Sequence, residues 1–162
     1  MTTEPTSLAT VYQGWDVYQG HLTKALAPLT AEQLTLRAAP HLRSLYEIAA
    51  HIIGARARWL SIDMGEGAAE LGDLGTWDRP TAPHHSAAEL VQALETSWSV
   101  LQGCLARWTT ADLAYVYEGD YHGEAYSDSR QWILWHLIEH DVHHGGELSF
   151  LLGMYHLPAP DL

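Results

Sequence analysis

The chain has 162 residues, a length at which one hydrophobic core is the usual organisation, so we predict a single domain over residues 1–162. Its 20 Asp and Glu against 8 Lys and Arg give a net charge of −12, which disfavours nucleic acid and anionic membranes as partners. The single cysteine, Cys104, excludes an intrachain disulfide framework and a thiolate zinc site. Because the sequence also lacks a leader pattern and a long apolar run, we expect a cytoplasmic protein.

In the first part of the chain, apolar residues recur every three or four positions, which is the period of an amphipathic helix. The pattern predicts a first helix over about residues 7–26, ended by Pro28. A Thr30–Gln33 capping box then opens a short helical connector. A second helix is predicted over about residues 44–64, beginning at a Ser44–Glu47 capping box.

The second half of the chain contains two further helical patterns. Residues 65–85 hold four glycines and two prolines, which predict a long surface connection without regular structure. A third helix is predicted from a Ser86–Glu89 capping box to about residue 108. A short hairpin is predicted over residues 115–126, with its turn near 118–120. The last helix should begin near Ser129 and end near residue 152. Together these elements predict an all-α, antiparallel four-helix bundle with a short hairpin before the last helix.

Histidines gather on one face of the predicted last helix. At about 100° per residue, His136, His140, His143 and His144 fall within an arc of roughly 100° on a helix that is otherwise largely apolar. A helix that is apolar on most sides is usually buried, and buried imidazoles need polar partners. A metal ion can be their shared partner, because two histidines four residues apart can reach one ion.

His51 supplies a third nitrogen from the most apolar part of the second helix, residues 48–53. Taken alone, His51 is typical of a core histidine, and the histidine face of the last helix is compatible with exposure to solvent. A core histidine on one helix and a histidine pair on another together predict a facial three-nitrogen metal site. By geometry, His140 can pair with either His144 or His136, so the spacing leaves both open.

Several other chemistries lack their motifs in this sequence. There is no H-E-x-x-H zinc motif and no E-x-x-H motif of a ferritin-like di-iron site. The nucleophile elbow G-x-S-x-G, the phosphate loop and the dinucleotide-binding G-x-G-x-x-G are also absent. Serine hydrolase, nucleotide hydrolase and dinucleotide oxidoreductase functions therefore have no support.

Three segments resemble the DinB/YfiT-like superfamily of metal-binding four-helix bundles. They are residues 44–52, residues 130–136 and the run HDVHHGGEL at 140–148. The resemblance implies a divalent metal ion, zinc or nickel, held by His51, His140 and His144, with His136 as the reserve ligand. It also implies that Glu47 and Glu147 are candidate catalytic, supporting or substitute groups beside the metal.

Characterised members of that superfamily include thiol S-transferases that use bacillithiol or mycothiol, and a mycothiol-dependent maleylpyruvate isomerase. The resemblance therefore implies a metal-dependent transferase that activates a small-molecule thiol for attack on an electrophilic substrate. One alternative is a metal-dependent hydrolase with Glu47, Glu139 or Glu147 as general base. Another is a non-enzymatic, metal-binding stress-response bundle. Exposed Trp and Tyr side chains are compatible with a homodimer, and the sequence leaves the oligomeric state open.

Overall fold

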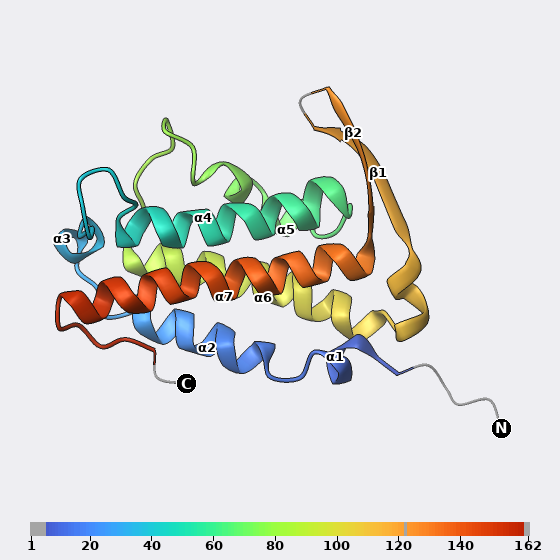
Figure 1. Ribbon diagram of the computed structural model, residues 1–162, viewed down its shortest axis with the longest axis horizontal. Coiled ribbons are helices and arrows are strands. Elements are labelled where there is room, and N and C mark those ends of the chain that lie inside the picture. The colour runs from blue at the N-terminus through green and yellow to red at the C-terminus, as the bar shows by residue number, and fades with distance from the viewer. Residues whose placement is uncertain (1–5, 122, 161–162) are drawn as a thin grey trace.

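The computed structural model describes residues 6–121 and 123–160, whose main body is formed by four long helices (Figure 1). These helices are α2 (Trp15–Leu26), α4 (Leu45–Arg58), α6 (Ala87–Arg107) and α7 (Arg130–Met154). Each buries an apolar face in a shared core. Fully or nearly fully buried side chains of that core include Leu22, Leu26, Ile52, Ile53, Leu90, Leu94, Leu137 and Leu148. The predicted all-α bundle is thus confirmed.

The directions of the four long helices show which path the connection between α4 and α6 takes. The colours of Figure 1 show that α4 runs antiparallel to α7, and α2 antiparallel to α6. The ends of α4 and α6 lie at the same end of the bundle, where Arg107 pairs with Glu66 at 2.7 Å. The connection over residues 65–85 therefore carries the chain back to the end at which α4 begins.

The helices begin where side chains satisfy the free N–H groups of the first turn. All three predicted capping boxes form, at α3 (Ala31–Leu34), α4 and α6. The pairs are Thr30 with Gln33, Ser44 with Glu47, and Ser86 with Glu89. The hydroxyl of Ser129 likewise accepts the N–H of Trp132 and caps α7. These local signals were sufficient to place four helix starts.

The predicted first helix is interrupted, so the prediction of one continuous helix over residues 7–26 is wrong. The chain forms a short α1 (Leu8–Val11), a turn, and then α2. Gly14 lies at the break with a φ of 103°, a conformation that side chains other than glycine rarely adopt. The turn places Trp15 against the core, where only 6% of it is exposed. Because the apolar period continues across the turn, periodicity alone did not reveal it.

The connection over residues 65–85 contains two short helices, contrary to the prediction of no regular structure. They are α5 (Ala68–Leu71) and a 3₁₀ turn (Leu74–Thr76). Leu71 and Leu74 are 1% and 8% exposed, so the segment is fixed to the bundle by apolar burial. This packing places the following residues, Trp77 and Asp78, beside α4.

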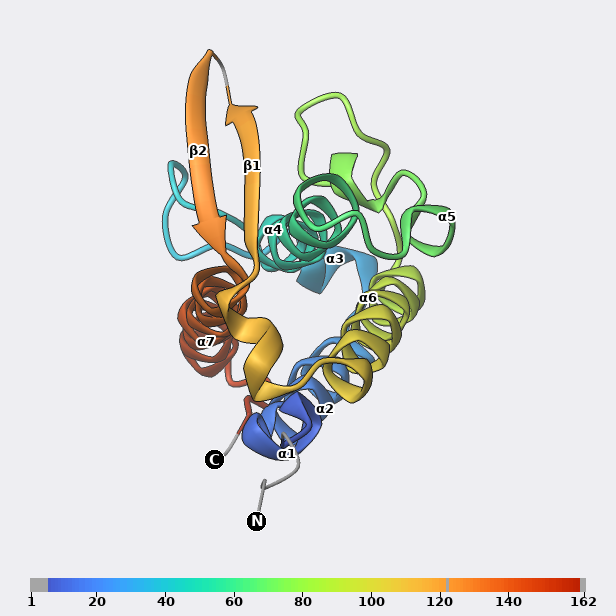
Figure 2. The same cartoon turned by 90° about the vertical axis from the view of Figure 1, so that its right-hand side faces the viewer.

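A two-stranded antiparallel hairpin precedes α7, as predicted, after a 3₁₀ turn (Thr110–Ala114). Its strands are β1 (Val116–Tyr121) and β2 (Glu124–Ser129). Residues 118–120, predicted as the turn, belong to β1, and the chain reverses only after Tyr121. The prediction of the turn was therefore wrong by a few residues. Figure 2 shows the hairpin rising beyond α4 and α7, on the same side of the bundle as the 65–85 connection.

The hairpin is attached to the end of α4 by one polar contact. A π-helical turn (Trp59–Asp63) continues α4, and the hydroxyl of Tyr126 donates a hydrogen bond to Asp63 in this turn. The Tyr126 ring lies over Gly119 on the paired strand, in the space that a side chain at residue 119 would fill. Glycine at this position therefore allows the contact that holds the hairpin over the α4–α7 pair.

Candidate metal centre

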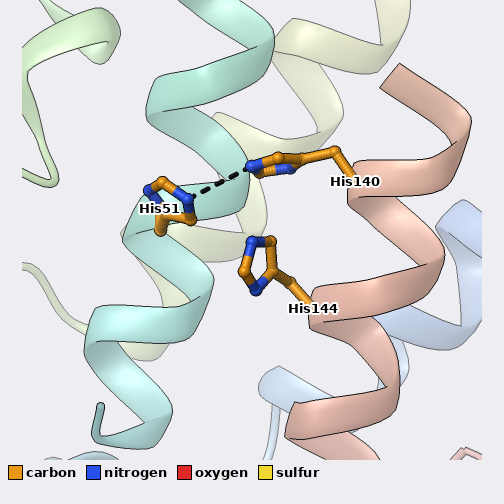
Figure 3. Close-up of side chains that lie close together, drawn as sticks. All are labelled: His51, His140 and His144. Atoms are coloured by element: carbon orange, nitrogen blue, oxygen red, sulfur yellow. Dashed lines mark hydrogen bonds between the residues drawn. The ribbon is translucent and has the colours of Figure 1, made fainter. Parts of the chain in front are cut away.

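His51, His140 and His144 meet between α4 and α7, as Figure 3 shows, and we call them the histidine trio. His51 projects from α4, and the other two project from consecutive turns of α7. The imidazole ring centroids are 4.4 to 4.8 Å apart. One candidate ligand atom from each side chain lies within 4.8 Å of the other two. The structure therefore brings together the three residues that the resemblance implied as ligands.

The spacing of two of these nitrogens fits a shared ion. His140 Nε2 lies 3.2 Å from His51 Nε2. Two nitrogens bound to one zinc ion at about 2.0 to 2.1 Å in tetrahedral geometry are about 3.3 Å apart. The donor set is also suitable, because imidazole nitrogens bind zinc, nickel and similar divalent ions. The three histidines can therefore hold one divalent metal ion.

The imidazole of His51 is oriented by a carboxylate from the 65–85 connection. His51 Nδ1 lies 2.9 Å from Asp78 Oδ2. Because an ionised carboxylate only accepts, Nδ1 carries the proton and Nε2 keeps its lone pair for a metal ion. Burial opposes the ionisation of Asp78, but hydrogen bonds from Arg58 and His51 outweigh it and hold the Asp78 pKa below its ordinary value.

The imidazole of His144 is oriented in the same way. Its Nδ1 lies 2.6 Å from Glu147 Oε2, one turn further along α7, so its Nε2 is directed to the trio. Burial lowers the His144 pKa below its ordinary value, although the bond to Glu147 acts in the opposite direction. Glu147 thus supports a ligand. It also forms a second, more exposed group with His143 and His144 whose candidate ligand atoms lie within 4.8 Å of one another.

The imidazole of His140 is desolvated by the surrounding helices. Burial, reinforced by the neighbouring His144 and His51, lowers the pKa of His140 to about 3. The imidazole is therefore neutral at physiological pH, which is the form that binds metals. Its Nδ1 is buried and has no hydrogen-bond partner among the described residues. Its other nitrogen, Nε2, faces His51 at 3.2 Å and is the atom positioned to bind a metal ion.

The reserve ligand His136 lies outside this group. Its ring stacks on Trp132 at a centroid distance of 5.1 Å and contacts the edge of Trp59 at 5.2 Å. Its centroid is 6.0 Å from that of His140. The structure thus places His144, rather than His136, with His51 and His140.

The other acidic candidates serve local structure. Glu47 accepts the backbone N–H of Ser44 at 2.7 Å and pairs with Arg37 at 3.3 Å. The Ser44 hydrogen bond is the main cause of a lowered Glu47 pKa, which makes this carboxylate a weak base. Glu139 is half exposed and lies 3.9 Å from His136.

Comparison with known proteins identifies the family. A model of the DinB family matches residues 1–154. The chain belongs to the DinB family. A DinB-like protein from Bacillus cereus has 24% identity and a TM-score of 0.73, over 98% of this chain and 99% of that one. A DinB-like protein from Bacillus subtilis has 15% identity and a TM-score of 0.60, over 90% and 91%.

At these identities the solved structures establish the DinB-like fold alone. A search of curated proteins found no match. Among the described residues, no helix combines the length and the apolar character needed to cross a membrane.

Three charged side chains near this DinB-family site, Asp78, Arg56 and Asp141, were not predicted from the sequence. Asp78 is 27 positions from His51 and lies in a connection predicted to lack structure. Arg56 and Asp141 form a fully buried ion pair between α4 and α7, with nitrogen–oxygen distances of 2.7 and 2.9 Å. Asp141 is part of the histidine-rich run, but no local pattern indicated its partner 85 positions away. The sequence feature that could have indicated this ion pair is Asp141 itself, an acidic residue within a largely apolar helix.

A cavity of about 550 Å³ lies between α4, α7 and the hairpin, and we call it the hairpin cavity. His51 and His140 form part of its wall, so it adjoins the histidine trio. The aromatic rings of Trp59 and Tyr126 also line it. A small molecule in the hairpin cavity would therefore contact the same side chains that are available to a metal ion.

Proposed function

We propose that this protein is a metal-dependent S-transferase, in which a small-molecule thiol attacks an electrophilic substrate at the histidine trio. Zinc or nickel is the proposed metal, held by His51, His140 and His144. The observation that carries the proposal is the juxtaposition of three metal-competent imidazoles with a cavity that two of them line. A site with three protein ligands leaves coordination positions for an exchangeable group, whereas structural zinc sites are closed by a fourth.

The chemistry of such a site suits a thiol. A divalent ion held by neutral imidazoles keeps its positive charge and lowers the pKa of a bound thiol, which then reacts as the thiolate. The side chains of Asp78 and Glu147 hold the imidazoles of His51 and His144 in the orientation that directs Nε2 inward. The aromatic rings that line the hairpin cavity offer an apolar surface to the electrophile.

The protein's own cysteine does not compete as the nucleophile. Cys104 is fully buried, and burial raises the pKa of its thiol to about 11. A thiol of this kind is largely protonated and inert at neutral pH. The reactive sulfur of the proposed reaction therefore comes from a small molecule.

Hydrolysis is less well supported by these contacts. A hydrolase needs a general base that is free to accept a proton from water. Glu47 is engaged by Ser44 and Arg37, and Glu147 by His144. Glu139 is half exposed beside His136, which lies outside the histidine trio. Both carboxylates have lowered pKa values, from the Ser44 hydrogen bond at Glu47 and, against the effect of burial, from the His144 hydrogen bond at Glu147.

A cobalt-substituted protein tests the proposal. We expect added 2-mercaptoethanol, glutathione or a related thiol to produce a sulfur-to-cobalt charge-transfer band in the near ultraviolet, with release of about one proton at pH 7. His51→Ala, His140→Ala and His144→Ala should each lose stoichiometric cobalt and the band. His136→Ala should keep both, because its ring lies outside the trio.

Three further results decide between alternatives. The Cys104→Ser protein must still show the band if the sulfur comes from the added thiol. A protein whose cobalt spectrum responds to acetate or hydroxide but to no thiol would contradict thiol transfer and favour hydrolysis. A spectrum that responds to no added ligand would favour a structural metal.

A further inference from the structure

A second cavity of about 550 Å³ shares His51 and Arg58 with the hairpin cavity but lies between α4 and the 77–84 part of the long connection. We call it the arginine cavity, because Arg43, Arg58 and Arg79 line it. The chain has only 8 Lys and Arg, and three of them line this one cavity. In a protein with a net charge of −12, such a concentration of positive charge creates a local site for anions.

The two acids of the arginine cavity already have partners. Asp78 accepts two hydrogen bonds from Arg58, at 2.7 and 2.9 Å. Glu47 pairs with Arg37, which lies next to the cavity. Among the described residues, no carboxylate lies within ion-pair distance of Arg43 or Arg79. Two guanidinium groups therefore remain available to a ligand.

The hairpin cavity has the opposite character. It is lined by the carboxylates of Asp63, Asp120 and Asp128, while Arg58, which also lines it, is already paired with Asp78. Its aromatic side chains include Trp59 and Tyr126. These carboxylates repel an anion, whereas the aromatic rings favour an uncharged, apolar group. The two cavities that meet at His51 thus select different chemistry.

We propose that Arg43 and Arg79 bind a carboxylate of the thiol substrate in the arginine cavity, while the apolar body of the electrophile occupies the hairpin cavity. Guanidinium groups bind carboxylates through paired hydrogen bonds in addition to charge, which makes arginine well suited to this recognition. The inference rests on the proposed function, since it assigns the two substrates of that reaction to the two cavities. The predicted thiol is acidic, and a neutral or cationic thiol is a poorer substrate.

The test compares two thiols of nearly the same shape, 3-mercaptopropionate and its uncharged amide, 3-mercaptopropionamide. Each is titrated into the cobalt-loaded protein while the sulfur-to-cobalt band is recorded. We expect the acid to bind about tenfold more tightly than the amide, as one charge-assisted pair allows. Arg43→Gln and Arg79→Gln should each weaken binding of the acid about three- to tenfold without changing binding of the amide.

Lys24→Gln is the matched control, because it removes one positive charge from an exposed position on α2, away from the cavity. It should alter neither affinity. Equal binding of the acid and the amide by the unaltered protein would overturn the inference. A preference for the acid that persists in both arginine variants would also overturn it, because the metal itself would then be the carboxylate's partner.

If neither thiol produces the band, the proposed function fails, and the anion site is tested by itself with succinate. Succinate should raise the melting temperature of the cobalt-loaded protein, and added salt should reduce the effect. A shift that Arg43→Gln and Arg79→Gln remove, but Lys24→Gln does not, would support the anion site without the thiol reaction. The absence of a succinate shift would refute the anion site.

Discussion

Asp78 acts on the metal centre through one imidazole. Its carboxylate lies between His51 Nδ1 at 2.9 Å and the guanidinium of Arg58, so it is held from two sides. Gly54, one turn before Arg58, leaves room for it, because a Cβ at residue 54 would lie 2.9 Å from Asp78 Oδ1. The carboxylate therefore fixes both the proton position and the orientation of the His51 ring.

We expect Asp78→Asn to weaken metal binding about 10- to 100-fold, as is typical for loss of a carboxylate that supports a histidine ligand. The amide is nearly isosteric but carries no charge to favour the proton on His51 Nδ1. Competition of the protein with a chelator for cobalt or zinc measures the affinity. Asp73→Asn, at an exposed position in the same connection, is the control and should bind metal normally. Unchanged affinity in Asp78→Asn would show that His51 is oriented by the fold alone.

At the scale of the elements, α7 carries two of the three histidines, and a glycine sets how closely it approaches α2. A Cβ at Gly145 would overlap the ring and hydroxyl of Tyr18 and lie 3.1 Å from Leu22 Cδ2. The Tyr18 hydroxyl also donates to the carbonyl of Val142 at 3.3 Å. By contrast, a Cβ at the next residue, Gly146, would meet no atom within 4 Å.

These neighbouring glycines should respond to alanine in opposite ways. Gly146→Ala should stabilise the protein by about 0.5 to 1 kcal/mol, because alanine has the higher helix propensity and the space is open. Gly145→Ala should destabilise it, since overpacking of about 1 to 3 kcal/mol exceeds the same propensity gain. Urea unfolding of both variants gives the two free energies. If Gly145→Ala is as stable as Gly146→Ala, then the Tyr18 ring moves aside freely and α2 does not constrain α7.

At the scale of the whole molecule, a buried polar network joins three of the four long helices. The guanidinium of Arg56 on α4 makes two bonds to Asp141 on α7 and a third, at 2.6 Å, to Gln19 on α2. The indole N–H of Trp15, also on α2, donates to Asp141 at 2.8 Å. Both ionised side chains are completely buried, so each depends on the other for compensation of its charge.

Asp141→Asn should therefore lower the free energy of unfolding by about 3 to 5 kcal/mol, because Arg56 would remain buried without a counter-charge. The double variant Arg56→Met with Asp141→Leu should lose much less, since it removes both charges together. Arg37→Gln, which breaks the exposed pair with Glu47, should cost less than about 1 kcal/mol. Urea denaturation measures all three. A double variant as unstable as Asp141→Asn would mean that packing, rather than charge, makes this site sensitive.

The sequence by itself determined the features that depend on neighbours in the chain. Apolar periodicity and three capping boxes located the long helices, because these signals act within one or two turns. The same logic located the histidine face of α7. It failed at Gly14, where the chain turns without breaking the apolar pattern, and in the 65–85 connection, where burial orders two short helices.

Only the tertiary structure decided which side chains act together at the site. His136 and His144 are each one helical turn from His140, so spacing could not choose between them. Packing separates them, because His136 lies against Trp132 and Trp59 whereas His144 faces His51. The Asp78–His51 contact and the Arg56–Asp141 pair likewise join residues 27 and 85 positions apart. The two cavities are also lined by segments that are distant in the sequence. Such contacts leave no periodic pattern, because they are formed by the docking of helices and connections and not by the chain's local geometry.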